Sequence, residues 1–194
     1  AGYTEDEAWR ALWAASAITK HLRACGQGTV LAVRGYHVQP HPGGTALRRL
    51  PLLSRHPRDR GQLWVQSLYL ARHGQTEYNV QGRIGGDPPL TAKGRMQAEA
   101  LALHLRDQKL DWVFTSTRMR SHETAAPLLR GRHETRVMAF KEFDEIWAGD
   151  CEGMCYSEIR ETMPEITAGR NADKYHYAYP HGESYAMLRE RVRR

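Results

Sequence analysis

The spacing of apolar residues changes along the chain, and the change divides it into two parts. A capping-box pattern followed by apolar residues at helical spacing predicts a helix over residues 4–23. Residues 29–35 are mostly apolar and form a candidate strand. Residues 37–62 are rich in proline, glycine and arginine, which predicts a long loop or linker. We therefore treat residues 1–62 as an N-terminal segment and residues 63–194 as a domain.

The second part alternates between short apolar runs and stretches with apolar residues three or four apart. This alternation is typical of an α/β fold, in which a mostly parallel sheet carries helices on both faces and forms a three-layer sandwich. Ligands bind such folds beyond the carboxyl ends of the strands. Thr91 is expected to cap a helix with Met96, Ala100 and Leu103 along one face. The predicted strands are 67–72, 111–116 and 136–141, and the predicted helices are 91–109, 118–129, 156–163 and 183–192.

Composition and charge indicate which partners and which cellular environment the protein is suited to. The net charge of +6 and the pI of about 9.4 favour anionic partners. No run approaches the roughly 20 apolar residues that a membrane span needs. The three cysteines are an odd number without a framework spacing, so we expect free thiols and a cytoplasmic location. The chain begins at Ala1 and stops at Arg194 inside a predicted helix, and we expect it to be a fragment.

The stretch LYLARHGQTEYNVQGRIGGD, residues 68–87, carries the most informative chemistry. A histidine stands between an arginine and a glycine where a predicted strand ends. A neutral imidazole can attack a phosphoryl group, and arginines stabilise the charge on its oxygens. The leaving alkoxide needs a proton, which a carboxylic acid can supply. The candidates are His73 as the nucleophile, Arg72, Arg83 and Arg120 as the phosphate cradle, and Glu145 as the acid.

The segment ARHGQTEYNVQGRIGGD resembles the opening signature of the histidine phosphatase, or phosphoglycerate mutase-like, superfamily. Its extended N-x-x-GRIGGD form is similar to the fructose-2,6-bisphosphatase domain of the bifunctional 6-phosphofructo-2-kinase/fructose-2,6-bisphosphatases. The segments FTSTRMRSHETA, EFDEIWAGDCEGMCYSEI and DKYHYAYPHGESY continue the resemblance in the same order. It covers about residues 67–194 and implies a phosphoglycerate mutase-like fold.

The resemblance also implies roles for individual residues. His73 would be the nucleophile that becomes phosphohistidine, and Glu145 would be the proton donor. The ligands of the reacting phosphate would be Arg72, Asn79 and Arg120, with Arg83 in the same signature.

The resemblance implies two further groups, which bind the rest of the substrate. Ile84 and Gly85 would lie in the sugar site, and the phosphate that is not cleaved would be bound by Tyr156, Arg170, Lys174 and Tyr185.

The reaction implied by the resemblance is hydrolysis of the 2-phosphate of fructose 2,6-bisphosphate to fructose 6-phosphate and phosphate. The partner would be this small sugar bisphosphate, and the reaction needs no metal or organic cofactor. ATP and Mg²⁺ are implied only for an attached kinase domain, through which a homodimer would form. Residues 1–62 would be the end of that kinase domain plus a linker, and they contain no P-loop sequence.

The chain departs from the family pattern at two places. The family has a second pocket histidine on a later strand, in an apolar-Cys-His-Gln context, and this chain stops at Arg194 before reaching it. We therefore expect a domain truncated at its C-terminus, with an open sheet edge. Trp147 stands where the family usually has an aspartate.

Several alternatives stay open. The chain could be another histidine phosphatase or mutase of phosphorylated metabolites, or an inactive sugar-phosphate-binding fragment. Glu142 and Asp144 are rivals of Glu145, whereas Arg118 is interpreted as a solvated charge. The His-Glu pairs at 122–123 and 133–134 lack the H-E-x-x-H spacing of a zinc site. The basic segment 48–60 lacks stacking aromatics, so a solvated linker is preferred to a nucleic-acid site, and we expect neither nucleic acid nor membrane as a partner.

Overall fold

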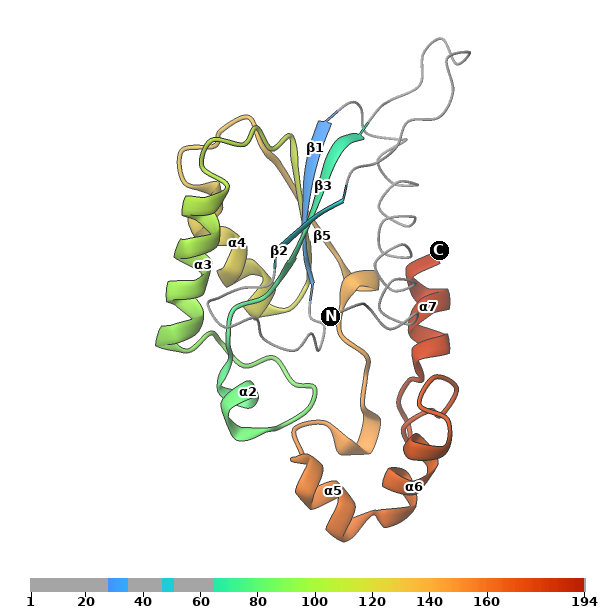
Figure 1. The fold of residues 1–194 in the computed structure, drawn as a ribbon. Helices are drawn as coiled ribbons and strands as arrows, with labels where there is room; N and C mark the ends of the chain where they lie inside the picture. Colours follow the sequence, from blue (N-terminus) through green and yellow to red (C-terminus); the bar gives the residue numbers. More distant parts are fainter. Residues whose placement is uncertain (1–27, 35–46, 51–64, 194) are drawn as a thin grey trace, which may run out of the picture.

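The fold is built around one mixed sheet (Figure 1). In a computed structural model of the chain, residues 28–34, 47–50 and 65–193 are described. Their five strands lie in the order β2-β3-β1-β4-β5. The strands are β1 (Gly28–Arg34), β2 (Leu47–Leu50), β3 (Val65–Arg72), β4 (Trp112–Ser116) and β5 (Arg136–Phe140). The helices are α2 (Glu77–Gln81), α3 (Ala92–His104), α4 (Met119–Leu129), α5 (Tyr156–Thr162), α6 (Pro164–Ala172) and α7 (Tyr185–Arg193), with short 3-10 turns η1 (Lys141–Phe143) and η2 (Gly149–Cys151).

Strand β1 occupies the centre of the sheet and confirms the candidate strand at 29–35. It lies between β3 and β4 and runs parallel to both. Arg34 is in register with Arg72 and Val33 with Thr115, so the three strands end at the same edge. The division of the chain at residue 62 stays a prediction. Among the described residues, however, strands from both sides of that position share one sheet.

Strand β2 corrects the prediction of an uninterrupted loop over residues 37–62. Its four residues, Leu-Arg-Arg-Leu, pair antiparallel with β3. So short a segment has no strand pattern of its own, and pairing with a neighbouring strand decides its conformation. The helix predicted over residues 4–23 and the rest of the arginine-rich segment lie outside the described residues.

Helices α3 and α4 cover one face of the sheet, as Figure 1 shows. Their apolar side chains pack on the sheet in a buried cluster that includes Tyr69, Leu101, Val113 and Leu128. Thr91 caps α3 as predicted, because its hydroxyl accepts from the Gly94 amide at 3.0 Å.

The boundary and the buried face of α3 differ from the prediction. The helix ends at His104 instead of near residue 109. Met96 and Leu103 are exposed, because α3 turns the small Ala98 and the branched Leu101 toward the sheet. The spacing of apolar residues along this helix therefore did not by itself identify the face that packs on the sheet.

The opposite face carries a row of aromatic rings. Trp112, Phe114, Phe140 and Phe143 follow one another with ring centroids 5.8, 5.4 and 5.2 Å apart. Phe143 belongs to η1, against which α7 packs on this side. The predicted three-layer α/β arrangement is thereby confirmed. Within the described ranges, no helix is long and apolar enough to cross a membrane.

Helices α5 and α6 lie beyond the sheet and have their own small core. Ile159 of α5 and Ile166 of α6 join Ile84, Ala148, Cys151 and Tyr179 in a second buried cluster. The loops from 83–86 and 145–155 are thus supported by this cluster. Ile84, Ala148 and Tyr179 of this cluster also line the candidate site.

Candidate active site

One pocket lies at the carboxyl end of β3 and extends toward α5, α6 and α7. Its position agrees with the crevice expected for an α/β fold. All of the predicted site residues line it, although they come from widely separated parts of the chain. They are Arg72, His73, Asn79, Arg83, Ile84, Gly85, Arg120, Glu145, Tyr156, Arg170, Lys174 and Tyr185. Their shared location is a structural fact, whereas their chemical roles stay predictions.

The ring of His73 is held in one orientation by the backbone of the next residue, Gly74. It is 8% exposed, and its Nδ1 lies 2.7 Å from the carbonyl oxygen of Gly74. A carbonyl oxygen can only accept, so the bond places a proton on Nδ1. In the neutral imidazole the lone pair is then on Nε2. Nε2 is the atom suited to attack a phosphorus atom in the pocket.

The turn after His73 is anchored to both helices of the first layer. The Gly74 amide donates to the hydroxyl of Thr124 on α4 at 3.0 Å. A Cβ atom on Gly74 would lie 2.4 Å from the Gly94 carbonyl oxygen on α3. A side chain at this position would collide with α3, so the packing of the turn explains why a glycine follows His73. The turn is therefore fixed before any ligand binds.

Arg72, which is half-buried, and Arg120, which is buried, bring positive charge to the same end of the pocket. Burial lowers the pKa of Arg72, and the nearby Glu145 acts in the opposite direction. Burial likewise lowers the pKa of Arg120, which is 5% exposed, against the raising effect of Glu145. Arg120 also donates to the carbonyl oxygen of Gly86 at 2.8 Å. A phosphoryl group would replace the solvation that these two cations lose on burial.

Glu145 is the carboxylate that faces this pocket, in preference to its neighbours. The carboxylate of Asp144 accepts from the Thr117 amide at 2.8 Å and from the Thr117 hydroxyl at 2.8 and 2.9 Å. It also lies 3.6 Å from Nε of Arg118. Asp144 therefore fixes the start of α4, and neither Glu142 nor Asp144 lines the pocket. Arg118 is paired in the same cluster and also stays outside the pocket.

The loop that carries Ile84 and Gly85 is clamped at its base. Arg83 donates to the Gly153 carbonyl oxygen at 2.6 Å and to the Gln81 side chain at 3.0 Å. Its Nη1 is also 3.4 Å from Glu158. Arg83 thus lines the pocket while its donors hold the loop together. The Oδ1 of Asn79 accepts from the Thr76 amide at 3.0 Å in a capping box, which leaves the Asn79 Nδ2 group as the donor for a ligand.

The other end of the pocket consists of cations beside tyrosine rings. The guanidinium carbon of Arg170 lies 4.5 Å from the centre of the Tyr179 ring, and the Lys174 ammonium lies 5.9 Å from that of Tyr185. Nη1 of Arg170 is buried and makes no hydrogen bond. A buried guanidinium nitrogen without a partner is uncommon and fits a site for an anion.

The tyrosines Tyr156, Tyr179 and Tyr185 line this end of the pocket together with Arg170 and Lys174. Burial raises the pKa of Tyr156, and Tyr185 adds to the shift while Arg170 opposes it. Burial also raises the pKa of Tyr179, again against Arg170. Their hydroxyls stay protonated at neutral pH and can donate to phosphate oxygens.

Five further pocket residues were not predicted from the sequence. They provide the floor and walls and are Thr76, Tyr78, Ile146, Ala148 and Tyr179. Thr76 could have been found as the cap of a short helix, since a threonine precedes a polar segment there. The other four carry no chemical signal in the sequence, and only packing brings them to the pocket.

Two exposed histidines of the later loop stay away from the site. His176 pairs with Asp173 at 2.8 Å, and His181 pairs with Asp150 at 3.0 Å. The indole Nε1 of Trp147 donates a hydrogen bond to the His181 carbonyl oxygen at 3.1 Å. Among the described residues, no three histidine, cysteine or acidic side chains gather as metal ligands. The absence of a metal from the reaction stays a prediction.

Comparisons with known proteins agree with this geometry. Residues 68–194 match the model of the histidine phosphatase superfamily (branch 1). Over 132 residues the chain is 43% identical to a 6-phosphofructo-2-kinase/fructose-2,6-bisphosphatase of Caenorhabditis elegans, which covers 67% of this chain and 28% of that protein. It is 44% identical over 128 residues to 6-phosphofructo-2-kinase/fructose-2,6-bisphosphatase 3 of Rattus norvegicus, covering 66% of this chain and 22% of that protein. The chain thus matches about a quarter of these relatives' length.

Solved structures show the same fold. The alpha-ribazole phosphatase of Shigella flexneri superposes with a TM-score of 0.58 and 31% identity over 62% of this chain and 60% of that one. Bacillus stearothermophilus YhfR gives a TM-score of 0.56 and 35% identity over the same shares. The similarity confirms the phosphoglycerate mutase-like fold, of which this chain covers a part.

Proposed function

Because the chain belongs to the histidine phosphatase superfamily, we propose that it hydrolyses the 2-phosphate of fructose 2,6-bisphosphate through a phosphohistidine at His73. The observation that carries the proposal is a single pocket with cations at both ends. Arg72 and Arg120 flank His73 at one end, and Arg170 and Lys174 lie at the other. A substrate with two phosphates fits such a pocket better than one with a single phosphate.

The proposed reaction has two steps. In the first, Nε2 of His73 forms a bond to phosphorus while the bond to the sugar oxygen breaks, and Glu145 gives a proton to that oxygen. In the second, a water molecule attacks the phosphorus, the P–N bond breaks, and Glu145 takes a proton from the water. The products are fructose 6-phosphate and inorganic phosphate. Arg72 and Arg120 stabilise the charge on the phosphoryl oxygens in both steps.

The test is to trap the covalent intermediate. The chain is mixed with fructose 2,6-bisphosphate labelled in the 2-phosphate and quenched in alkali, and protein-bound label is then tested for loss in acid. We expect acid-labile label and release of phosphate with the unchanged chain. We expect neither with His73→Ala, whereas His122→Ala, a change to an exposed histidine of α4, keeps both.

Each other outcome has a definite meaning. Label without turnover would indicate a binding fragment that cannot complete the reaction. Label from other phosphate esters only would indicate a histidine phosphatase for another metabolite, such as those acted on by the structural neighbours. Label that persists in His73→Ala would overturn the proposed nucleophile.

A bifunctional protein is proposed as the context of this domain, since the matched relatives carry that name. In that context ATP and Mg²⁺ would serve a kinase region, a homodimer would form through it, and the whole protein would be cytoplasmic and regulate glycolysis. These statements concern sequence outside this chain. Purifying the full-length gene product and assaying it for ATP-dependent formation of fructose 2,6-bisphosphate would test them.

A further inference from the structure

Glu183 and Arg191 form an ion pair that holds the backbone around Glu145. Nε and Nη2 of Arg191 donate to the two carboxylate oxygens of Glu183, each at 2.9 Å. The two side chains are mostly covered, at 18% and 23% exposure. A two-point arginine–carboxylate contact of this kind fixes both side chains in orientation as well as distance.

The same arginine also binds the chain just before the pocket. Nη1 of Arg191 donates to the carbonyl oxygens of Lys141 and Glu142 at 3.0 and 2.8 Å. Its Nη2 lies 3.2 Å from the carbonyl oxygen of Asp144 and 3.4 Å from that of Glu145. One guanidinium group therefore binds four carbonyl oxygens of the segment from Lys141 to Glu145, in addition to the backbone bond from the Asp144 amide to the Lys141 carbonyl oxygen.

The partner carboxylate binds the chain just after Glu145. One oxygen of Glu183 accepts from the Trp147 amide at 3.0 Å, and the Glu183 amide donates to the Trp147 carbonyl oxygen at 2.8 Å. The Asp150 amide adds a bond to the Pro180 carbonyl oxygen at 3.0 Å. The backbone on both sides of Glu145 is thus fixed by the pair and by the loop that carries Glu183.

We propose that Glu183 and Arg191 are positioning residues for the proton transfer by Glu145. The inference rests on the proposed function, because it assigns the pair to the proton-donating step of that reaction. Neither side chain lines the pocket, so they act through the backbone and not on the substrate. The Glu145 carboxylate itself accepts from the Ile146 amide at 3.1 Å, so its direction depends on the same backbone.

Two substrates separate a positioning role from a merely structural one. An aliphatic sugar alkoxide needs a proton as it leaves, whereas nitrophenolate does not, because nitrophenol ionises near neutral pH. Displacing the general acid should therefore slow formation of the phosphohistidine from the sugar phosphate and leave its formation from p-nitrophenyl phosphate unchanged. The second step, in which Glu145 acts as the base, is common to both substrates, so the comparison is made on the first step. A loss of folded protein would instead reduce the amount of phosphohistidine formed from both substrates by the same factor.

The experiment compares Arg191→Gln, Arg191→Lys and Glu183→Gln with the unchanged 194-residue chain. In rapid-quench measurements, we expect the rate constant for phosphohistidine formation from fructose 2,6-bisphosphate to fall by about 100-fold in Arg191→Gln, with less than about a threefold change for p-nitrophenyl phosphate. Arg191→Lys should recover part of the loss, because an ammonium group keeps the charge but cannot make the two-point contact.

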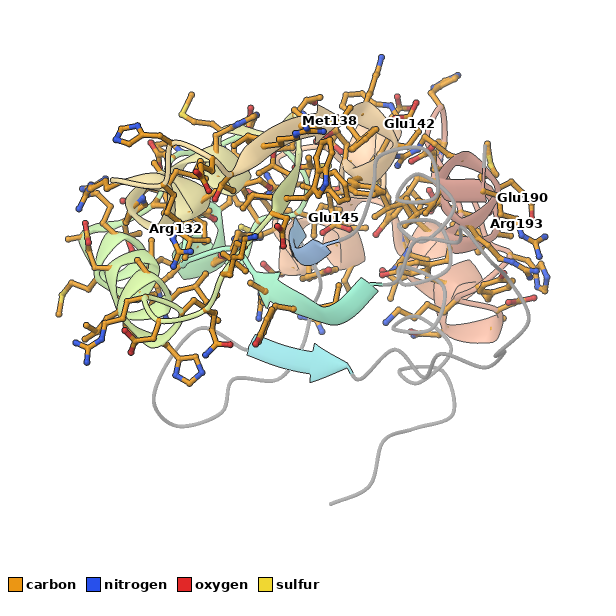
Figure 2. All side chains as sticks on the ribbon, turned by 90° about the horizontal axis from the view of Figure 1, so that it is seen from above. Arg132, Met138, Glu142, Glu145, Glu190 and Arg193 are labelled. Carbon is orange, nitrogen blue, oxygen red and sulfur yellow. The ribbon has the colours of Figure 1, made fainter. Side chains whose placement is uncertain are left out.

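Arg193→Gln is the matched control. This arginine lies on the same helix and pairs with the exposed Glu190 at 3.1 Å. Figure 2 shows Glu190 and Arg193 on the outer side of the molecule, away from Glu145. We expect unchanged rates on both substrates.

The outcomes also separate this inference from the proposed function. If the unchanged chain hydrolyses neither substrate, the proposed function fails. If it is active and the Arg191 and Glu183 variants form the phosphohistidine from both substrates with equally reduced rate constants, or with unchanged ones, the positioning role is overturned. Thermal unfolding of each variant measures the fraction folded at the assay temperature.

Discussion

The two ends of the pocket are built on different supports. The end with His73 stands on strand termini and on the first turn of α4, above the large core between sheet and helices. Two of its functional groups, His73 and Arg120, are buried, at 8% and 5% exposure. The end with Arg170 stands on α6 and nearby loops over the smaller core. There Tyr156 is 49% exposed.

This difference fits different roles for the two ends in the proposed reaction. A reacting phosphoryl group needs fixed partners, because small displacements cost rate. The sheet supplies such fixed positions, because backbone hydrogen bonds from β1 to both β3 and β4 hold the ends of these strands in register. A phosphate that is not cleaved needs affinity and selectivity, which cations beside aromatic rings supply with less exact geometry. Mutations at the first end should therefore affect kcat, and mutations at the second should affect KM.

The largest effect is expected from Arg120→Gln. This change removes a buried charge from the reacting end and leaves a shorter, neutral polar side chain. We expect kcat on fructose 2,6-bisphosphate to fall by about 10²–10³-fold, because stabilisation of developing charge is lost. Steady-state kinetics measures it. A kcat within about threefold of the original would contradict the assignment of Arg120 to the reacting phosphate.

A smaller effect of a different kind is expected from Arg170→Gln. Loss of a charged hydrogen bond to a phosphate should raise KM by about 10–100-fold while kcat changes little. The control is p-nitrophenyl phosphate, which has no second phosphate and should react with unchanged KM. Equal effects on both substrates would show that Arg170 supports the fold and does not bind the second phosphate.

Gly85 and Gly131 compare a glycine inside the pocket with one outside it. Both have a positive φ, at 64° and 71°. A Cβ on Gly85 would lie 2.0 Å from an oxygen of Glu152, whereas a Cβ on Gly131 would meet nothing within 4 Å. We expect Gly85→Ala to lower the free energy of unfolding by about 2–3 kcal/mol and Gly131→Ala by about 1 kcal/mol. Urea denaturation measures both, and equal losses would contradict the steric argument.

The smallest effect concerns the dependence of stability on pH. Burial alone would raise the pKa of Glu183, but hydrogen bonds from Arg191 and from the Trp147 amide outweigh it and hold the pKa below its ordinary value of 4.5. A lowered folded-state pKa adds stability above the ordinary value, and this contribution is lost as the pH falls through the folded value. Glu183→Gln should therefore flatten the fall in Tm from about pH 5 downward. An unchanged slope would contradict this account.

The fold and the site could be predicted to different extents. Strands β3 and β4 and helix α4 follow from local patterns, because their apolar runs and spacing reflect burial. Strand β5 also follows from an apolar run, although four of its five residues are exposed. Helices α2 and α6 were not predicted. The five residues of α2 include no buried side chain, so they give no amphipathic pattern. Strand β2 has only four residues and depends on its neighbour.

Site residues with distinctive chemistry were found by motif, and those without it were not. His73 and the arginines stand in recognisable surroundings, whereas Tyr179 and Ala148 enter the pocket only because loops pack together. The sequence resemblance favoured Glu145 over Asp144, and the structure adds that Glu145 is the one that lines the pocket. Three carboxylates lie within four positions, and only their directions separate the one at the pocket from the one that binds Thr117.

The sequence by itself determined the candidate nucleophile, the cations around it and the alternation of strands and helices, since these depend on residue type and local spacing. Tertiary structure alone decided that an N-terminal strand fills the centre of the sheet, because pairing between distant segments leaves no local trace. It also decided that Glu183 and Arg191 hold the backbone on both sides of Glu145. That arrangement depends on long-range hydrogen bonds, which residue type and spacing do not specify.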